Sequence, residues 1–337
     1  FRVKGKSLWI VGAGVDSTIL VTKAGYGVFF DNAGEAGIRN LAITGGIRDT
    51  CGMATDAAIV ARNTRLLVQG CWIRDNVQYP ESIIVGIGGV MGREGAELTV
   101  INNRITNNTW DGVALYRGAT ALIADNEITK GRGAGVGITW DASATVLRNR
   151  VSHYWKGIGS FGATRVICRN NIVYNLIGWG IIATGTSYMD CANNIIYQNG
   201  NCGFGLWGPE VHGRFTNNVI VKNGWREQWV CPRVGVWNYG HPIQFPMTHN
   251  LFWENVEGDW RDMPDYTDEY GNVHVDPLWD TLTFMSLPDS PLIDKGNPEL
   301  TDPDGTVSDL GIYGGPQGFR SPIEITRTGP IDTRKKK

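Results

Sequence analysis

The sequence predicts an all-β protein, a right-handed parallel β-helix in which one chain winds into a solenoid of about nine coils. Three observations predict it: a repeat of about 23 residues, three short β-type runs in each repeat, and an asparagine that recurs at one position of the repeat. A repeat architecture overrides the two or three ordinary domains that a length of 337 residues would otherwise indicate.

The repeat is followed most easily through the apolar residue that comes after an Asn-rich pair. Its copies are Ile43, Ile73, Ile105, Ile128, Val151, Val173, Ile196, Ile220 and Phe252. Runs such as GVALY, ATALIA and NRIT alternate apolar residues with Gly or Asn and carry no helical stripe. A propeller blade would need four strands in about 40 residues, whereas three strands in about 23 residues close one triangular coil.

One asparagine per coil falls at the same phase of the repeat. The column consists of Asn103, Asn126, Asn149, Asn171, Asn194, Asn218 and Asn250. Asparagine tolerates left-handed backbone angles, and its amide can hydrogen-bond to the same residue one coil away. The column is therefore predicted to be a structural ladder and not a set of ligands.

Charge and hydropathy exclude two classes of partner. The net charge is -2, so the chain lacks the basic field that nucleic-acid binding needs. We find no apolar run near the roughly 18 residues that span a bilayer, and we expect no membrane insertion. The chain begins at Phe1 in a strand-like segment, so a signal peptide is not part of this sequence.

The six cysteines are Cys51, Cys71, Cys168, Cys191, Cys202 and Cys231, and their spacings match no zinc site. Cys202 and Cys231 fall in neighbouring coils near the segment 224–233, and we predict a disulfide that pins this loop. Cys168 and Cys191 each stand three residues before a ladder asparagine, and are predicted to be stacked core thiols.

Residues 8–255, through the coil period and the asparagine column, resemble the pectin-lyase-like superfamily of β-helix proteins. The segment SPLIDKGNPELTDPDGTVSDLGIYGG (290–315) is similar to the closing segment of many secreted bacterial members. The resemblance implies a secreted or cell-surface protein that acts on or binds a polysaccharide or oligosaccharide. We expect a β-helix over 1–255, a long loop and capping segment over 256–320, and a disordered tail over 321–337.

The closing segment is expected to cover the unpaired strand edges at the end of the solenoid. Asp302, Asp304 and Asp309 lie at short loop spacings within it, as carboxylate ligands of calcium do. Calcium is therefore a candidate cofactor, although three aspartates that cap turns would give the same pattern.

Enzymes of this superfamily usually act on the outer face of one strand per coil, which here begins with glycine, as in GVALY from Gly112. Because strand side chains alternate, the third and fifth residues of each run point outward. Aromatic residues in or beside these columns are candidate sugar-binding platforms: Trp140, Phe161, Trp207, Trp237 and Tyr239. Aromatics on alternate coils would lie roughly 10 Å apart, although packing under loops is an alternative role.

Polar groups beside this face are the catalytic candidates: Tyr116, Arg117, Asp141, Lys156, Glu210, His212 and His241. They fit a lyase that cleaves a uronate polysaccharide by β-elimination, which needs charge neutralisation and a base. The alternatives are a glycoside hydrolase and a non-catalytic glycan-binding module. A hydrolase needs two carboxylates roughly 5 to 9.5 Å apart, whereas Asp141 and Glu210 stand about three coils apart.

Overall fold

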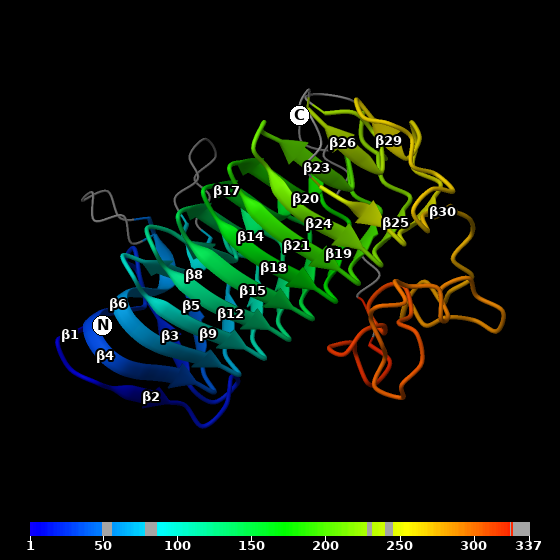
Figure 1. The fold of residues 1–337 in the computed structure, drawn as a ribbon. Helices are drawn as coiled ribbons and strands as arrows, with labels where there is room; N and C mark the ends of the chain where they lie inside the picture. The colour runs from blue at the N-terminus through cyan, green and yellow to red at the C-terminus, as the bar shows by residue number, and fades with distance from the viewer. Residues whose placement is uncertain (49–55, 78–85, 228–230, 240–244, 324, 326–337) are drawn as a thin grey trace. The chain divides into compact units, whose positions relative to one another are not determined.

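The computed structural model describes residues 1–337 except 49–55, 78–85, 228–230, 240–244, 324 and 326–337. It contains two compact units, one of Phe1–Asn149 with Ile158–Val166 and the other of Arg150–Gly157 with Ile167 onward. Strands in each unit stack in parallel from coil to coil (Figure 1), which confirms the predicted right-handed β-helix. In the described part of the chain we find no helix long and apolar enough to span a membrane.

The first unit begins with two coils of unequal strands and continues with regular coils of three strands. Its strands are β1 (Arg2–Lys4), β2 (Trp9–Val11), β3 (Ile19–Val21), β4 (Val28–Arg39), β5 (Ala42–Thr44), β6 (Ala57–Gln69), β7 (Trp72–Arg74), β8 (Gly88–Arg93), β9 (Glu97–Ile101), β10 (Arg104–Thr106), β11 (Val113–Leu115), β12 (Thr120–Ala124), β13 (Glu127–Thr129), β14 (Ala134–Trp140) and β15 (Ser143–Leu147). β17 (Lys156–Gly162) and β18 (Arg165–Arg169) contribute residues to both units.

The register of β6, β8, β11 and β14 fixes the outer face of the first unit. Val60 pairs with Met91, Met91 with Ala114, and Ala114 with Gly137. Neighbouring strands of a sheet lie about 4.8 Å apart, so each column places equivalent side chains of successive coils side by side. The inward residues Val113, Leu115, Val136 and Ile138 are fully buried and form the core between the faces.

The second unit has the same design. Its strands are β16 (Arg150–Ser152), β19 (Ile172–Tyr174), β20 (Trp179–Gly185), β21 (Tyr188–Ala192), β22 (Ile195–Tyr197), β23 (Phe204–Trp207), β24 (His212–Thr216), β25 (Val219–Val221), β26 (Val236–Asn238), β27 (Met247–Thr248), β28 (Leu251–Trp253), β29 (Trp260–Arg261) and β30 (Val273–His274). Thus the coils continue beyond residue 255, because β29 pairs with β26 and β30 pairs with β28.

The predicted asparagine ladder is confirmed in both units. In the first, the side-chain amide of Asn103 donates to Asn126 at 3.0 Å, and that of Asn126 donates to Asn149 at 2.9 Å. In the second, the ladder runs through Asn171, Asn194, Asn218 and Asn250 to Asn272. A further ladder that the sequence reading missed links Asn199, Asn223 and Asn255.

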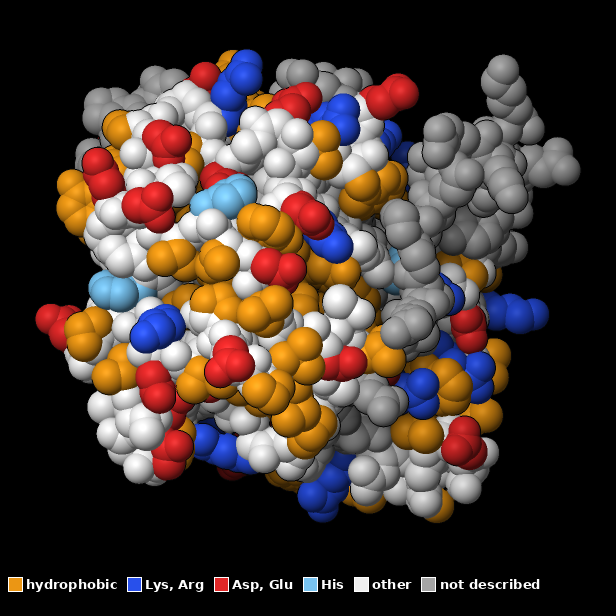
Figure 2. Space-filling view, turned by 90° about the vertical axis from the view of Figure 1, so that its right-hand side faces the viewer, with side chains coloured by type: hydrophobic (Ala, Val, Ile, Leu, Met, Phe, Trp, Pro, Cys, Tyr) orange, Lys and Arg blue, Asp and Glu red, His pale blue; other side chains and the backbone are white. Residues whose placement is uncertain are grey.

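The C-terminal segment packs on the flank of the second unit, and a cover over the end of the solenoid stays a prediction. Trp279, Phe284, Leu292, Leu310 and Ile312 bury themselves against the outward side chains of β19, β22, β25 and β28. Those outward residues are apolar, which is why this face accepts a covering segment. Exposed hydrophobic residues remain on the segment itself, and Figure 2 shows hydrophobic side chains gathered across one face.

Three asparagines with left-handed backbone angles attach this segment to the coils. Asn170 donates to the Gly314 carbonyl at 2.8 Å and Asn193 to the Asp309 carbonyl at 2.9 Å. The side-chain oxygen of Asn217 accepts from the Asn297 amide at 2.7 Å. One residue type therefore closes each turn and also holds the covering segment.

The predicted disulfide between Cys202 and Cys231 is absent from the structure. Both are buried thiols, and their sulfur atoms lie 3.9 Å apart, well beyond the roughly 2.05 Å of a bond. Cys168 and Cys191 are buried thiols, as predicted, and burial raises the pKa of Cys191 well above its usual value.

Candidate functional site

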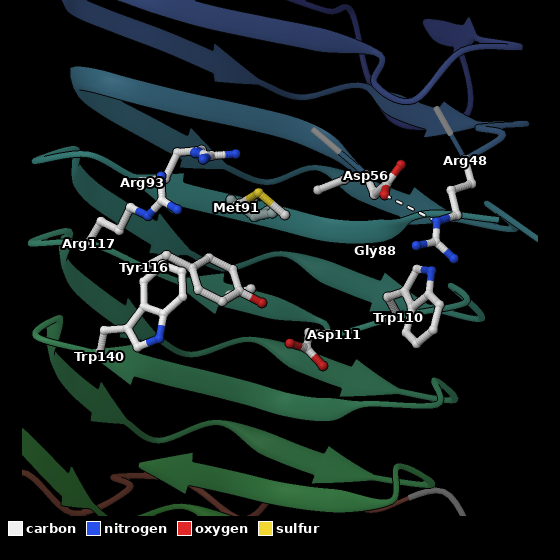
Figure 3. Close-up of a pocket in the computed structure, with 13 residues that line it drawn as sticks. Arg48, Asp56, Gly88, Met91, Arg93, Trp110, Asp111, Tyr116, Arg117 and Trp140 are labelled. Carbon is white, nitrogen blue, oxygen red and sulfur yellow. Dashed lines mark ion pairs between the residues drawn. The ribbon is translucent and has the colours of Figure 1, made fainter. Parts of the chain in front are cut away.

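A pocket of about 350 Å³ opens on the outer face of the first unit. It is lined by Arg48, Asp56, Ala57, Gly88, Val90, Met91, Arg93, Trp110, Asp111, Ala114, Tyr116, Arg117 and Trp140. Figure 3 shows Tyr116, Trp140, Arg93 and Arg117 at one side of the pocket and Trp110 and Arg48 at the other. Met91 and Asp111 lie between these two groups.

The pocket floor follows from side-chain size in one column of the outer face. Phe29, Val60, Met91, Ala114 and Gly137 occupy successive coils in register. The side chains shrink from Met91 through Ala114 to Gly137, so space opens above Ala114 and Gly137. The adjacent column supplies polar groups. Arg62 pairs with Arg93 in this column. Tyr116 follows in the next coil, where its amide donates to the Gly92 carbonyl.

Asp111 is held against the next coil. Its Oδ1 accepts a hydrogen bond of 2.6 Å from the Ala134 amide. A methyl group at Gly133 would lie 1.9 Å from Oδ1, and one at Gly137 would lie 3.1 Å from Oδ2. Only glycine at Gly133 leaves room for the carboxylate in this position.

Tyr116 faces Asp111 across the pocket, and its hydroxyl points into the open space (Figure 3). Burial raises the pKa of Tyr116 to about 12, and the charge of Asp111 adds to this effect while Arg93 opposes it. Its ring meets the Trp140 ring edge-on, with centroids 5.7 Å apart. Tyr116 is therefore protonated at neutral pH and suited to donate a proton or a hydrogen bond.

Arginines at the edge of the pocket are tied to one carboxylate. Arg93 donates two hydrogen bonds to Glu94, at 2.6 and 2.8 Å, and Arg117 donates a third at 3.1 Å. These contacts lower the pKa of Glu94, with the bond from Arg93 the largest cause. The Arg117 guanidinium also lies over the Trp140 ring, 4.8 Å from its centroid.

At the opposite side, Arg48 forms an ion pair of 3.4 Å with Asp56 and lies over the Trp110 ring at 5.6 Å. The lining therefore offers three guanidinium groups, two carboxylates and two indole rings. Such a lining can bind a polar ring-shaped molecule by stacking and by charged hydrogen bonds.

The predicted residues of the first unit fall into two groups. Tyr116, Arg117 and Trp140 line the pocket together. Asp141 does not; it accepts a hydrogen bond of 2.8 Å from the Gly118 amide and caps that turn. Phe161 lies over the position of Gly159, where an added methyl would be 2.3 Å from its ring.

The other predicted residues that the structure describes belong to the second unit. Trp207, Trp237 and Tyr239 form a cluster with centroids 5.0 to 5.5 Å apart, and Trp237 donates to Asp262 at 2.9 Å. The Lys156 ammonium lies 5.6 Å from the centroid of the Trp179 ring. His212 stacks edge-on with Tyr188 and its Nδ1 contacts the Glu210 carbonyl. His241 lies outside the described residues.

The three aspartates considered for calcium act as turn caps in the structure. Asp304 accepts from the Thr306 amide and hydroxyl, Asp302 from the amides of Asp309 and Gly315, and Asp309 from the Asp294 amide. Burial raises the pKa of Asp309 to about 6, and neighbouring aspartates add to the shift. Within the described ranges, no three His, Cys, Asp or Glu residues converge as a metal site.

Five pocket residues were not among the candidates predicted from the sequence: Arg48, Asp56, Arg93, Trp110 and Asp111. Asp56 directly precedes β6 and Arg93 ends β8, whereas Trp110 and Asp111 lie in the turn before β11. The column register, with Asp111 opposite Gly88 and Ala134, was the signal that could have found the aspartate.

Comparisons with known proteins agree with this architecture. The family model for the right-handed beta helix region matches residues 85–252. This match and the fold agree with the sequence resemblance to right-handed parallel β-helix proteins of the pectin-lyase-like superfamily. No curated protein matches it in sequence.

Two solved structures are similar in fold. The A-module of the mannuronan C-5 epimerase AlgE4 from Azotobacter vinelandii is 11% identical, with 82% of this chain and 89% of that chain covered and a TM-score of 0.52. The catalytic unit of a thermostable GH87 alpha-1,3-glucanase from Streptomyces thermodiastaticus strain HF3-3 is 14% identical, with 82% and 60% covered and a TM-score of 0.50. At these identities the likeness shows the fold alone.

Proposed function

We propose that the protein is a carbohydrate-active enzyme that cleaves a uronate-containing polysaccharide by β-elimination in the pocket of the first unit. The observation that carries the proposal is that Tyr116 and Asp111 face one pocket beside arginines and between two tryptophans. The similar structures include a mannuronan C-5 epimerase and an alpha-1,3-glucanase, which supports a carbohydrate substrate. A secreted location stays a prediction of the sequence resemblance.

In this reaction Arg93 or Arg48 pairs with the uronate carboxylate and lowers the cost of forming a carbanion next to it. The Asp111 carboxylate takes the proton from the carbon adjacent to that carboxylate. A carbon–carbon double bond forms as the glycosidic carbon–oxygen bond breaks, and the Tyr116 hydroxyl protonates the leaving oxygen. Solvent then returns a proton to Tyr116 and removes one from Asp111.

A second candidate is a glycoside hydrolase that uses Asp56 and Asp111. The Gly88 amide bonds to the Asp56 carbonyl at 2.8 Å and the Gly89 amide to the Asp111 carbonyl at 2.9 Å, so one coil separates the two aspartates. Their backbones are therefore roughly 10 Å apart by the strand spacing. Inverting hydrolases hold their two carboxyl groups roughly 6.5 to 9.5 Å apart, so this reaction requires the two side chains to lean toward each other.

The test is to incubate the protein with neutral and uronate polysaccharides and to measure two products. A lyase generates unsaturated ends that absorb ultraviolet light together with reducing ends, whereas a hydrolase generates reducing ends alone. Binding without either product would contradict both reactions and favour a glycan-binding module. Asp111→Asn and Tyr116→Phe variants, which preserve side-chain shape, assign either reaction to this pocket.

A further inference from the structure

The turn that follows the outer strands of the first unit changes its residue type from coil to coil. Its residues in successive coils are Asn32, Asn63, Glu94, Arg117 and Trp140, and all have left-handed backbone angles, with φ between 44° and 63°. In the next coil Gly162, with φ of 110°, lies against the Trp140 backbone. Asparagine and glycine adopt this conformation readily, whereas Glu, Arg and Trp do so at a cost.

The Glu, Arg and Trp residues of this turn lie at the pocket. Arg117 and Trp140 line it, and Glu94 holds Arg93 and Arg117 at its rim. Asn32 and Asn63, at the same turn of the preceding coils, do not line it, and Asn63 simply donates to Asn32 at 2.8 Å. Left-handed angles also occur at Lys130, Arg148 and Lys222, which do not line the pocket, so the side chains at this turn and not its backbone angles distinguish it.

We propose that Glu94, Arg117 and Trp140 form a binding ridge for the sugar residue next to the one in the pocket. The inference rests on the proposed function and adds a second subsite to it. Trp140 is 50% exposed and offers a ring for stacking on the apolar face of a sugar. The Arg117 side chain is 55% exposed and offers a guanidinium for a carboxylate or hydroxyl of the same residue.

Glu94 is a positioning residue in this ridge. It holds the Arg117 guanidinium by a hydrogen bond of 3.1 Å while that group lies over Trp140 at 4.8 Å. Trp140 in turn meets the ring of Tyr116 at 5.7 Å. A sugar bound on the ridge therefore contacts Trp140. Trp140 packs on Tyr116, and the Tyr116 hydroxyl faces Asp111.

The experiment compares binding with stability in variants that restore a favourable turn residue. Arg117→Asn and Trp140→Asn copy the residue at Asn63, and Asn63→Gly is the matched control in the same column. For each variant we would measure KM and kcat on the polysaccharide that the wild type cleaves, and the midpoint of thermal unfolding. Glu94→Gln and Glu94→Asp test positioning, since Asp retains the charge that binds Arg117.

We expect Trp140→Asn to raise KM about five- to tenfold and to lower kcat much less, as for loss of uniform binding. Arg117→Asn should raise KM and leave the unfolding midpoint equal to the wild type or about 1 to 2 °C higher, because strain is relieved. Glu94→Gln should raise KM. Glu94→Asp should raise KM less, because Asp retains the charge that binds Arg117. Asn63→Gly should leave KM unchanged.

Unchanged KM in both asparagine variants, with an active wild type, would overturn the ridge and leave the proposed function intact. A fall in the unfolding midpoint of Arg117→Asn by more than a few degrees would also overturn it, because the residue would then be structural. A wild type that neither cleaves nor binds any polysaccharide would overturn the proposed function instead.

Discussion

The Asp111 carboxylate and the Ala134 amide of the next coil share a hydrogen bond of 2.6 Å, which fixes the carboxylate in the pocket. The bond requires glycine at Gly133, because a methyl group there would lie 1.9 Å from the Asp111 oxygen. The absence of a side chain at Gly133 thus determines the position of the proposed base, Asp111.

Gly133→Ala should displace Asp111 and abolish activity nearly as completely as Asp111→Ala does. The chain should remain folded, with a loss of about 1 to 3 kcal/mol in the free energy of unfolding from overpacking. Gly137→Ala is the graded comparison, since its methyl group would lie 3.1 Å from the other oxygen and should cost less activity. Steady-state rates and denaturant unfolding would be measured for both glycine variants. Full activity in Gly133→Ala would exclude Asp111 from the reaction.

Tyr116→Phe should change stability at high pH as well as activity. Burial raises the pKa of Tyr116 from 10.0 in the unfolded chain to about 12 in the folded protein. Its neutral form therefore stabilises the fold fully below pH 10.0, and this contribution is lost as pH rises toward about 12. The wild type should lose more stability than Tyr116→Phe over this range in urea titrations. Parallel curves would show that the hydroxyl is solvated.

Asp31→Asn should destabilise the first unit by about 2 kcal/mol or more, since it leaves Arg2 and Arg62 without their buried partner. Asp31 accepts from Arg2 at 2.5 Å and from Arg62 at 2.7 Å, and its side chain is fully buried. Burial acts to raise the pKa of Asp31, but the bonds from both arginines outweigh it and lower the pKa. This stabilisation is present above pH 3.8 and is lost as pH falls through the lowered pKa.

The matched control is Asp125→Asn, which removes the partly exposed pair with Arg148 at 2.7 Å. Exposed pairs contribute little, so the expected loss is below about 1 kcal/mol. Equal losses in the two variants, measured by denaturant unfolding at neutral pH, would contradict the role assigned to burial of Asp31.

A disulfide oxidant should link Cys202 to Cys231, with the oxidant reduced to two thiols. The sulfur atoms are 3.9 Å apart, and a small side-chain rotation brings them to the roughly 2.05 Å of a bond. Titration under denaturing conditions should count two thiols fewer in the oxidised wild type than in the reduced form. Cys231→Ser should show no such loss, whereas Cys168→Ser should retain it. An unchanged count in the wild type would mean that the pair is rigid.

The coil architecture could be predicted because it depends on local repetition. Ladder asparagines such as Asn126 recur at every coil, and each hydrogen bond joins residues one period apart. The face that binds the C-terminal segment could also be predicted from the sequence. Its outward positions change from Arg104 and Glu127 in the first unit to Ile172 and Ile195 in the second, which indicates a covered face.

The pocket could not be predicted in the same way. Asp56, Asp111 and Tyr116 come from different coils, and no motif joins them. Side chains at turns are aimed by backbone angles, so two catalytic candidates from the sequence have different partners: Asp141 accepts from the Gly118 amide, and Arg117 donates to Glu94. Only the register between coils and the left-handed turns reveal which groups converge.

The measurement that tests the central claim most directly compares Asp111→Asn with Glu210→Gln on a uronate polysaccharide that the wild type cleaves. Both changes remove one carboxylate charge, but only Asp111 lies in the pocket of the first unit. We expect Asp111→Asn to lose about a hundredfold or more in the rate of unsaturated-end formation, and Glu210→Gln to match the wild type. Full activity in Asp111→Asn, or the loss appearing in Glu210→Gln instead, would contradict the assignment of the active site.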